Sequence, residues 1–312
     1  MKKVKTALFI ICSFLISHLI CCTGMAASAE EYYSIGMAYF DLGKYEEAEK
    51  WLNRARQADK TMIASTYNLG RLAYERQRFN EAAMYFEDIL KKDPDNILAL
   101  KAAAYSRIKT GDIETADMHY SRLLELVPES ADDGYNHALV LFAMERYQEA
   151  EAVLQRYPAS LLDNRDVMLL FARSRKAQNK AEAIDSYAEI LNISSDPKVR
   201  CEYAQVLEYH HLYARSIEEY RKAYSDTSSS SIDPRRCDIR FLIARVLLIA
   251  DGDSGEGITE LEGAVKDGFG DTSRIEELLN YREISAEHIV SIHKIIDDMR
   301  RGEAEAGEAV LR

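Results

Sequence analysis

The side chains that could bind a metal or carry out acid–base chemistry are few and poorly grouped in this sequence. His210 and His211 are adjacent, so on a helix their side chains point in different directions. His288 and His293 are five residues apart, a spacing that does not place two ligands on one helix face. No His-Glu-x-x-His zinc motif, Walker-type phosphate loop or Gly-x-Ser-x-Gly nucleophile turn occurs. We therefore predict no metal site, no cofactor and no enzymatic activity.

The cysteines suggest two kinds of covalent chemistry. Residues 19–22 (LICC) resemble a bacterial lipobox in which Cys22 would carry the lipid, although bulky residues stand where this motif usually has small ones. Cys201 and Cys237 lie far from this segment. In an oxidising compartment they could pair as a disulfide, or they could remain separate buried thiols on neighbouring helices.

Residues 1–29 resemble an export signal. Three lysines precede an apolar run that ends at Cys22 and is too short for a stable membrane span. Ala27-Ser28-Ala29 forms an A-x-A site with cleavage before Glu30. We expect either plain cleavage after residue 29 or cleavage after residue 21 with lipidation of Cys22. Both routes export the protein, to the periplasm or to a membrane-anchored lipoprotein facing the periplasm.

Composition excludes several classes of protein. Hydrophobic residues make up 47% of the 312 residues, which argues against a disordered or fibrous chain. The net charge is −12, and it becomes −15 without residues 1–29, so nucleic-acid binding is disfavoured. Five prolines and 14 glycines are few for a turn-rich all-β protein. The unusual feature is 19 tyrosines against nine phenylalanines and one tryptophan.

A period of 34 residues organises the chain behind the leader. One series of small residues keeps this spacing, and a second small series follows twelve residues after each member of the first. The first series is Gly36, Gly70, Ala104, Ala138 and Ala172. The second is Ala48, Ala82, Ala116 and Ala150, continued at altered spacing by Ala183 and Ser216. Such self-similarity indicates a repeated supersecondary unit.

The first unit shows what each repeat would build. Apolar residues between Tyr32 and Tyr39 follow the i, i+3, i+4, i+7 pattern of a helix. Gly43 tolerates a positive φ and would end this helix before a second one starts near Tyr45. Two helices joined by so few residues fold back as an antiparallel hairpin. Each hairpin retains apolar surface, so it must stack on the next one.

This pattern resembles the tetratricopeptide repeat family. The matching units are Tyr32 to Ala55, residues 63–96 with their Asp93-Pro94 ending, and residues 97–130, 131–163, 164–196 and 197–226. The fourth unit has a shortened second helix that ends near Tyr157-Pro158. The resemblance implies an all-α protein, a right-handed α-solenoid of helix-turn-helix hairpins with six repeats in residues 30–226.

The remaining residues, 227–312, depart from the repeat pattern. The polar stretch 225–233 has the composition of an enlarged loop. Residues 238–266 are expected to form a degenerate helical hairpin. Ser273 and Glu276 would make a capping box for a short helix. A last amphipathic helix from about Ala286 to Met299 would cap the open end of the stack.

One face of the first helices carries the side chains best suited to binding. In the family's fold, that face looks into the concave groove of the superhelix. The predicted groove residues are Tyr33, Met37, Phe40, Tyr67, Arg71, Tyr74, Lys101, Tyr105, Tyr135, Phe142, Arg173 and Lys176. Aromatic rings bury large areas at low entropy cost, and the cations would meet carboxylates of a partner. The alternative is that these rings mainly pack neighbouring first helices together.

The resemblance implies a non-catalytic scaffold or adaptor of the bacterial cell envelope, which would hold a partner protein or peptide in this groove. Two alternatives are an oligomeric ligand-binding accessory of an envelope transporter and an outer-membrane assembly lipoprotein. A carboxylate clamp for C-terminal peptides is disfavoured, because Tyr33 and Met37 occupy the clamp positions and only Asn68 matches. We expect no nucleic-acid partner and no membrane contact except through a lipid at Cys22, while a homo-oligomer stays open.

Overall fold

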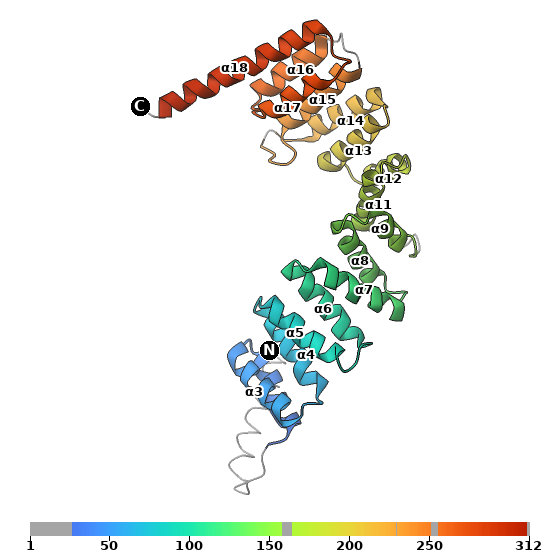
Figure 1. Ribbon diagram of the computed structural model, residues 1–312, viewed down its shortest axis with the longest axis vertical. Coiled ribbons are helices and arrows are strands. Elements are labelled where there is room, and N and C mark those ends of the chain that lie inside the picture. The colour runs from blue at the N-terminus through green and yellow to red at the C-terminus, as the bar shows by residue number, and fades with distance from the viewer. Residues whose placement is uncertain (1–26, 158–163, 229, 251–254, 311–312) are drawn as a thin grey trace. The chain divides into compact units, whose positions relative to one another are not determined.

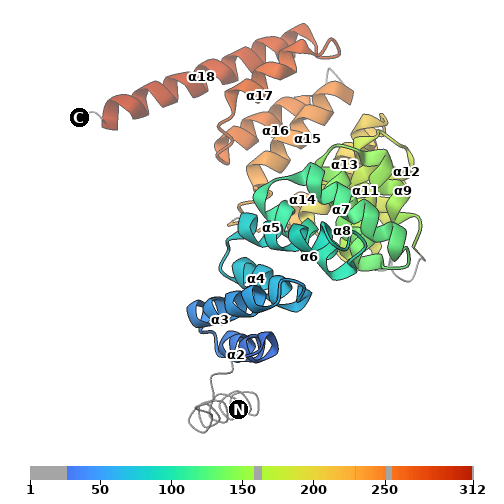
Figure 2. The ribbon, with the colours of Figure 1, turned by 60° about the horizontal axis from the view of Figure 1, so that its bottom comes forward.

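The computed structural model describes residues 27–157, 164–228, 230–250 and 255–310, and only the backbone over 303–310. Within these ranges the chain is helical and contains no strand, which confirms the predicted all-α class (Figure 1). Successive helices pack side by side as hairpins (Figure 2). The predicted leader up to residue 26, including Cys22, lies outside the described residues.

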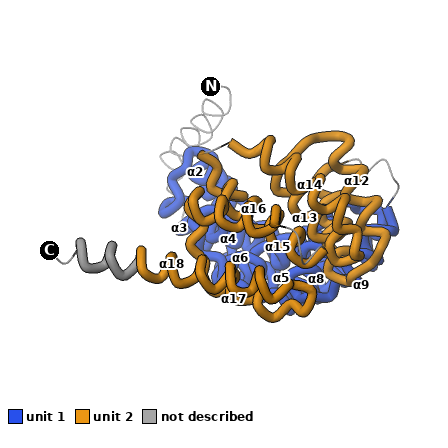
Figure 3. Tube along the Cα trace, turned by 90° about the horizontal axis from the view of Figure 1, so that it is seen from above, with its two compact units in different colours: residues 1–161 blue, residues 162–312 orange. Residues whose placement is uncertain are grey.

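The chain forms two compact units, residues 1–161 and 162–312 (Figure 3). The first unit contains four helical hairpins in its described part. Their helices are α2 (Ala29–Asp41) with α3 (Tyr45–Ala58), α4 (Ile63–Glu75) with α5 (Phe79–Leu90), α6 (Ile97–Thr110) with α7 (Ile113–Leu126), and α8 (Ala131–Ala143) with α9 (Tyr147–Leu154). The shortness of α9 confirms the predicted truncation of the fourth repeat.

The second unit contains three further hairpins and a group of C-terminal helices. The hairpins are α11 (Arg165–Ala177) with α12 (Glu182–Ile193), α13 (Pro197–Tyr209) with α14 (Tyr213–Asp226), and α15 (Arg236–Ala250) with α16 (Gly255–Lys266). The C-terminal group is α17 (Thr272–Glu276), the 3-10 helix η1 (Glu277–Asn280) and α18 (Ala286–Val310). α18 therefore continues well beyond Met299, where the amphipathic pattern predicted its end.

Small residues stand where the two helices of a hairpin cross. A Cβ added at Gly36 would lie 2.8 Å from Cγ of Leu52, and one added at Gly70 would lie 2.7 Å from Cε1 of Phe86. At these distances a methyl group would force the neighbouring side chain to shift, so glycine fits both crossings best. The 34-residue series of small residues therefore reflects the close approach of paired helices.

The turn inside each of the six hairpins from α2–α3 to α13–α14 places one residue in the left-handed region of the backbone. The residues with this positive φ are Gly43 (71°), Gln77 (60°), Gly111 (80°), Glu145 (59°), Asn179 (58°) and His211 (59°). The prediction for Gly43 is confirmed, and the same geometry recurs at four residues that carry a side chain. Left-handed backbone is costly for such residues, so the packing of the flanking helices must impose it.

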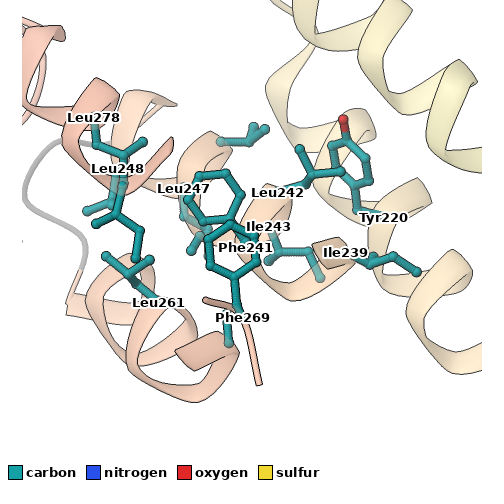
Figure 4. Close-up of a cluster of buried hydrophobic side chains, with 14 of the residues drawn as sticks. Tyr220, Ile239, Phe241, Leu242, Ile243, Leu247, Leu248, Leu261, Phe269 and Leu278 are labelled. Atoms are coloured by element: carbon teal, nitrogen blue, oxygen red, sulfur yellow. The ribbon is translucent and has the colours of Figure 1, made fainter. Parts of the chain in front are cut away.

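The core of the second unit extends into its C-terminal helices. The rings of Phe241 and Phe269 stack face to face with centroids 4.3 Å apart, close to Leu261 and Leu278 (Figure 4). Isoleucines of α18 are buried in the same cluster. The predicted capping box at Ser273 is wrong, because the Asp271 side chain caps α17 by accepting a hydrogen bond from the backbone N–H of Arg274 (3.2 Å). The C-terminal helices are thus part of this core.

The two cysteines of the second unit, Cys201 and Cys237, are both buried and both free thiols. They belong to the same hydrophobic cluster. Burial raises the pKa of the Cys201 thiol to about 12. The Cys201 thiol is therefore not set up as a reactive nucleophile near neutral pH.

Candidate partner-binding surface

The predicted groove residues all lie on the first helices of hairpins, but they divide between the two units. Ten lie on α2, α4, α6 and α8 of the first unit, and we call them the first-helix face. The first-helix face is Tyr33, Met37, Phe40, Tyr67, Arg71, Tyr74, Lys101, Tyr105, Tyr135 and Phe142. Arg173 and Lys176 lie on α11 in the second unit, so they do not belong to it.

Contacts between α2 and α4 join three members of this face. The Nδ2 of Asn68 donates a hydrogen bond to the Tyr33 hydroxyl (3.1 Å), and Nη1 of Arg71 donates one to Oδ1 of Asn68 (2.9 Å). The Arg71 guanidinium also lies over the ring of Phe40, with its carbon 5.1 Å from the ring centroid. Tyr33, Phe40 and Arg71 therefore form one continuous surface through Asn68.

Contacts between α6 and α8 extend the surface. The Nδ2 of Asn136 donates a hydrogen bond of 2.8 Å to the hydroxyl of Tyr105. The Lys101 ammonium lies 2.7 Å from Oδ1 of Asp133, whose side chain is buried. The hydrogen bond to Asp133 raises the pKa of Lys101. Lys101 is therefore charged and already paired within the protein, so a partner carboxylate would have to compete with Asp133.

Between α4 and α6 the surface opens into a hollow of 340 Å³. Its lining residues are Arg71, Tyr74, Glu75, Phe86, Ala102 and Tyr105. Three of the predicted groove residues thus meet around one cavity. Burial raises the pKa of Tyr74, so its phenol is neutral at physiological pH. The hollow combines apolar walls with one cation and one carboxylate.

The aromatic members of the face also pack inside their own hairpins. Five of these rings contact an aromatic ring of the second helix, with centroids 5.0 to 6.3 Å apart. The pairs are Phe40–Tyr45, Tyr67–Phe86, Tyr74–Phe79, Tyr105–Tyr120 and Phe142–Tyr147. Met37 and Tyr135 are half-buried, whereas Tyr105 and Leu139 remain 36% and 40% exposed. Packing therefore accounts for one side of these rings and leaves part of their surface open.

In the second unit the two predicted cations are bound by residues of α13. Nη2 and Nε of Arg173 donate to the two carboxylate oxygens of Glu202 at 2.6 and 2.9 Å. Tyr187 donates a further hydrogen bond to Glu202 (2.9 Å). Lys176 donates to the side-chain oxygen of Gln205, and burial lowers the pKa of this lysine. Both cations are thus engaged inside the protein.

Two contributors to the first-helix face were not among the predicted groove residues. Asn68 and Asn136 each bond a tyrosine of the preceding first helix. They are two repeat periods apart, and Ala102 occupies the same place in the repeat between them. This recurrence is visible in the sequence, but three-dimensional contacts are needed to show that the amides reach the tyrosines.

One polar cluster has the composition of a catalytic triad but not its geometry. His137 Nε2 lies 2.7 Å from Oδ1 of Asp117 and 3.5 Å from Oγ of Ser121. An activated serine needs the acid and the hydroxyl on opposite ring nitrogens, whereas here one nitrogen faces both. Burial of the ring lowers the pKa of His137. The cluster is a structural link between α7 and α8.

Metal ligation and membrane spanning can be judged over all the described residues of the chain. Over those residues, no group of three His, Cys, Asp or Glu side chains is placed to hold a metal ion. No helix among them has both the length and the apolar character needed to cross a bilayer.

Sequence comparison identifies the repeat. The tetratricopeptide repeat profiles match residues 29–61 and 67–131. A tetratricopeptide repeat protein from Parabacteroides merdae has a similar structure, with a TM-score of 0.50 and 20% sequence identity. The similarity covers 81% of this chain and 98% of that one, and at this identity it supports the fold alone.

Two curated relatives match parts of the chain. An uncharacterised lipoprotein of Treponema pallidum (strain Nichols) is 25% identical over 151 residues, which are 48% of this chain and 77% of the relative. The human protein O-mannosyl-transferase TMTC3 is 29% identical over 128 residues. That second match covers 40% of this chain but only 14% of the transferase, so it concerns a small part of that protein.

Proposed function

Because the chain is a tetratricopeptide-repeat protein, a type of solenoid whose stacked hairpins present extended binding surfaces, we propose that it is a non-catalytic scaffold of the bacterial cell envelope. Its partner is a protein or peptide held on the first-helix face. The observation that carries the proposal is the contact network from α2 through α4, and from α6 to α8, which joins open aromatic rings around one hollow.

The mechanism is presentation of rings that are already held in place. Five of the rings are fixed on one side by an aromatic partner of their own hairpin, so binding them costs little side-chain entropy. Hydroxyls of Tyr33 and Tyr105 already accept a hydrogen bond from an amide and can still donate one to a bound backbone carbonyl. Interfaces rich in tyrosine gain much of their binding energy from such anchors.

The envelope location rests on the leader and on one relative. Residues 1–29 have the pattern of an export signal, and the Treponema pallidum relative is named a lipoprotein. In this proposal residues 30–226 form the array of six repeats that carries the first-helix face in its first four repeats, and residues 227–312 close the end of the array. No reaction is assigned to any residue.

The test of the binding surface is partner capture in the cell of origin. Tyr67→Ala combined with Tyr105→Ala should abolish cross-linking of the partner to the native protein. The matched control is Tyr209→Ala, which removes a 56% exposed tyrosine from α13 of the second unit. Circular dichroism should show that both variants are folded. Undiminished capture by the folded double variant would refute the first-helix face as the binding surface.

The lipid anchor is tested separately. Metabolic labelling with radioactive palmitate should mark the wild-type protein and not Cys22→Ser, if cleavage occurs at residue 21. Absence of label from both proteins assigns plain cleavage after residue 29. This result leaves the scaffold in the periplasm and disfavours the outer-membrane assembly lipoprotein.

A further inference from the structure

The hollow between α4 and α6 is lined by the one repeat of three that lacks an asparagine side chain at this place. Asn68 on α4 and Asn136 on α8 occupy equivalent places, and each amide fills the space toward a tyrosine of the preceding first helix. Ala102 on α6 holds the place between them. Its methyl group lines an open space together with Arg71, Tyr74 and Tyr105.

The size and walls of this space suit one large apolar side chain. Its 340 Å³ is near the lower end of the range of about 300–1,000 Å³ found for ligand pockets. Phe86 is among the lining residues but offers little surface, since it is only 1% exposed, and the small residue at Gly70 lets its ring lie close to α4. Tyr74 and Tyr105 supply two further aromatic walls. Rings of this kind favour an aromatic or leucine side chain.

The charged residues beside the hollow favour one position for an acidic group of the bound segment. Arg71 is exposed, and the ion pairs described for the structure include no carboxylate partner for it, in contrast to Lys101 with Asp133. It contacts Phe40 and Asn68, on the side of α2. Glu75 lies one turn further along α4 and would repel a carboxylate at its own end. An acidic group is therefore favoured only on the Arg71 side.

We propose that this hollow, the Ala102 pocket, takes one aromatic or leucine side chain from an extended segment of the partner, and that an acidic residue next to this anchor pairs with Arg71. The inference rests on the proposed function, because it places the anchor of the partner on the first-helix face. It adds the chemical class of the segment that the protein selects.

The experiment is selection of linear peptides from a randomised displayed library on the immobilised protein. Selected peptides should share an aromatic residue or leucine with Asp or Glu beside it. Ala102→Asn should place the polar amide of the neighbouring repeats inside the apolar pocket and weaken binding of a selected peptide about tenfold or more. The matched control is Ala152→Asn on an exposed helical site of α9, which carries the same loss of helix propensity and should leave binding unchanged.

The charge part is tested by Arg71→Glu. Selection on this variant should replace the acidic neighbour by Lys or Arg while the apolar anchor is retained. An unchanged preference for acidic neighbours would overturn the role of Arg71.

The remaining outcomes distinguish failure of the Ala102 pocket from failure of the first-helix face as the binding surface. Peptides that bind Ala102→Asn normally but are lost in the Tyr67→Ala, Tyr105→Ala variant would overturn the pocket and support the face. Peptides that bind all of these variants equally would overturn both. A library that yields no peptide dependent on Ala102 also overturns the pocket.

Discussion

The corresponding faces of the first helices carry different side chains in the two units. On α4 and α6, Tyr74 and Tyr105 line an open hollow, and Arg71 beside them has no carboxylate partner among the ion pairs of the described residues. On α11, α13 and α15, charged side chains pair with one another across hairpins, as Arg173 does with Glu202 and Arg245 with Glu208 at 2.6 Å. The hairpin fold therefore allows this face either to bind a partner or to hold neighbouring hairpins together.

This difference indicates which unit binds a partner and which unit uses its charged side chains to stabilise the fold. A carboxylate already held by arginine offers little to a partner, because the partner must replace an existing hydrogen-bonded pair. Exposed aromatic area has no such competitor. The first unit is thus expected to bind, and the charge pairs of the second unit are expected to hold neighbouring hairpins together.

The largest expected effect comes from breaking a charge pair of the second unit. Glu202→Ala leaves the half-buried Arg173 and the hydroxyl of Tyr187 without their shared acceptor. We expect a loss of about 2–3 kcal/mol in the free energy of unfolding of the second unit. Hydrogen exchange should show faster exchange in α11–α13 and none of this effect in α4–α6.

Glu189→Ala on α12 is the matched control, since it removes an exposed glutamate from the same unit. Its unfolding free energy should stay within about 0.5 kcal/mol of wild type. Equal losses of unfolding free energy in the two variants would mean that the pairs of Glu202 stabilise the unit no more than an exposed glutamate does.

The next effect concerns the hairpin crossings. Gly70→Ala in the first unit would place a methyl group 2.7 Å from the Phe86 ring and should cost about 1–3 kcal/mol. The equivalent crossing of the second unit already accommodates the buried Ala172. Ala172→Gly should cost less, about 0.5–1 kcal/mol, through backbone entropy and lost contact. Denaturant unfolding of both variants measures the difference, and an inverted order would contradict the crossing argument.

A smaller effect of opposite sign is expected at the hairpin turns. Gln77→Gly should stabilise the first unit by about 0.5–1 kcal/mol, because glycine adopts the φ of 60° without steric cost. Asn179→Gly in the second unit should gain less, since asparagine tolerates left-handed backbone better. Thermal unfolding curves should rank the two variants in this order. Destabilisation by Gln77→Gly would show that its side chain matters more than its backbone.

The smallest effect expected is a dependence of the first unit on pH. Burial lowers the pKa of His119 and His137 below the ordinary value of 6.5, so the unfolded chain takes up protons before the folded one. Stability should be complete above pH 6.5 and should decline as the pH falls from 6.5 toward the lower folded pKa values. Glu87 opposes the shift at His119, which keeps the effect modest.

The measurement is hydrogen exchange of α7 and α8 at pH 7 and pH 5.5, corrected for intrinsic exchange. His119→Gln should reduce the pH dependence of protection in these helices. Helices α11 and α12 of the second unit, which contain no histidine, provide the internal reference. A stronger decline there than in α7 and α8 would rule out the histidines as the cause.

The repeat was predictable from sequence because steric demands at helix crossings recur with the period of the chain. Gly36 and Gly70 mark such crossings, and Gly43 marks a turn whose φ is positive. The φ of Gln77 is also positive, yet a glutamine in the sequence does not predict it, because the packed helices rather than the residue impose that conformation. Local preference and tertiary packing agree at the first turn and conflict at the second.

The candidate surface was predictable only in outline. Helical periodicity placed Arg71, Tyr74 and Tyr105 on one side of their helices, and the structure brings them around one hollow. The pairing of Lys101 with Asp133 was not foreseen, because it depends on side-chain conformations across two repeats. The importance of Ala102 was also missed, since its effect comes from atoms that it lacks relative to Asn68 and Asn136.

The order of helix contacts in the first unit determines how proteolysis would shorten it. Each helix from α2 to α9 packs mainly on the helix before it and the helix after it in the chain. Cleavage in the loop between α3 and α4 would remove one hairpin and its contacts with α4, while the contacts among helices α4 to α9 would remain. A protease would therefore trim this surface by whole repeats, and a shortened protein would retain the Ala102 pocket.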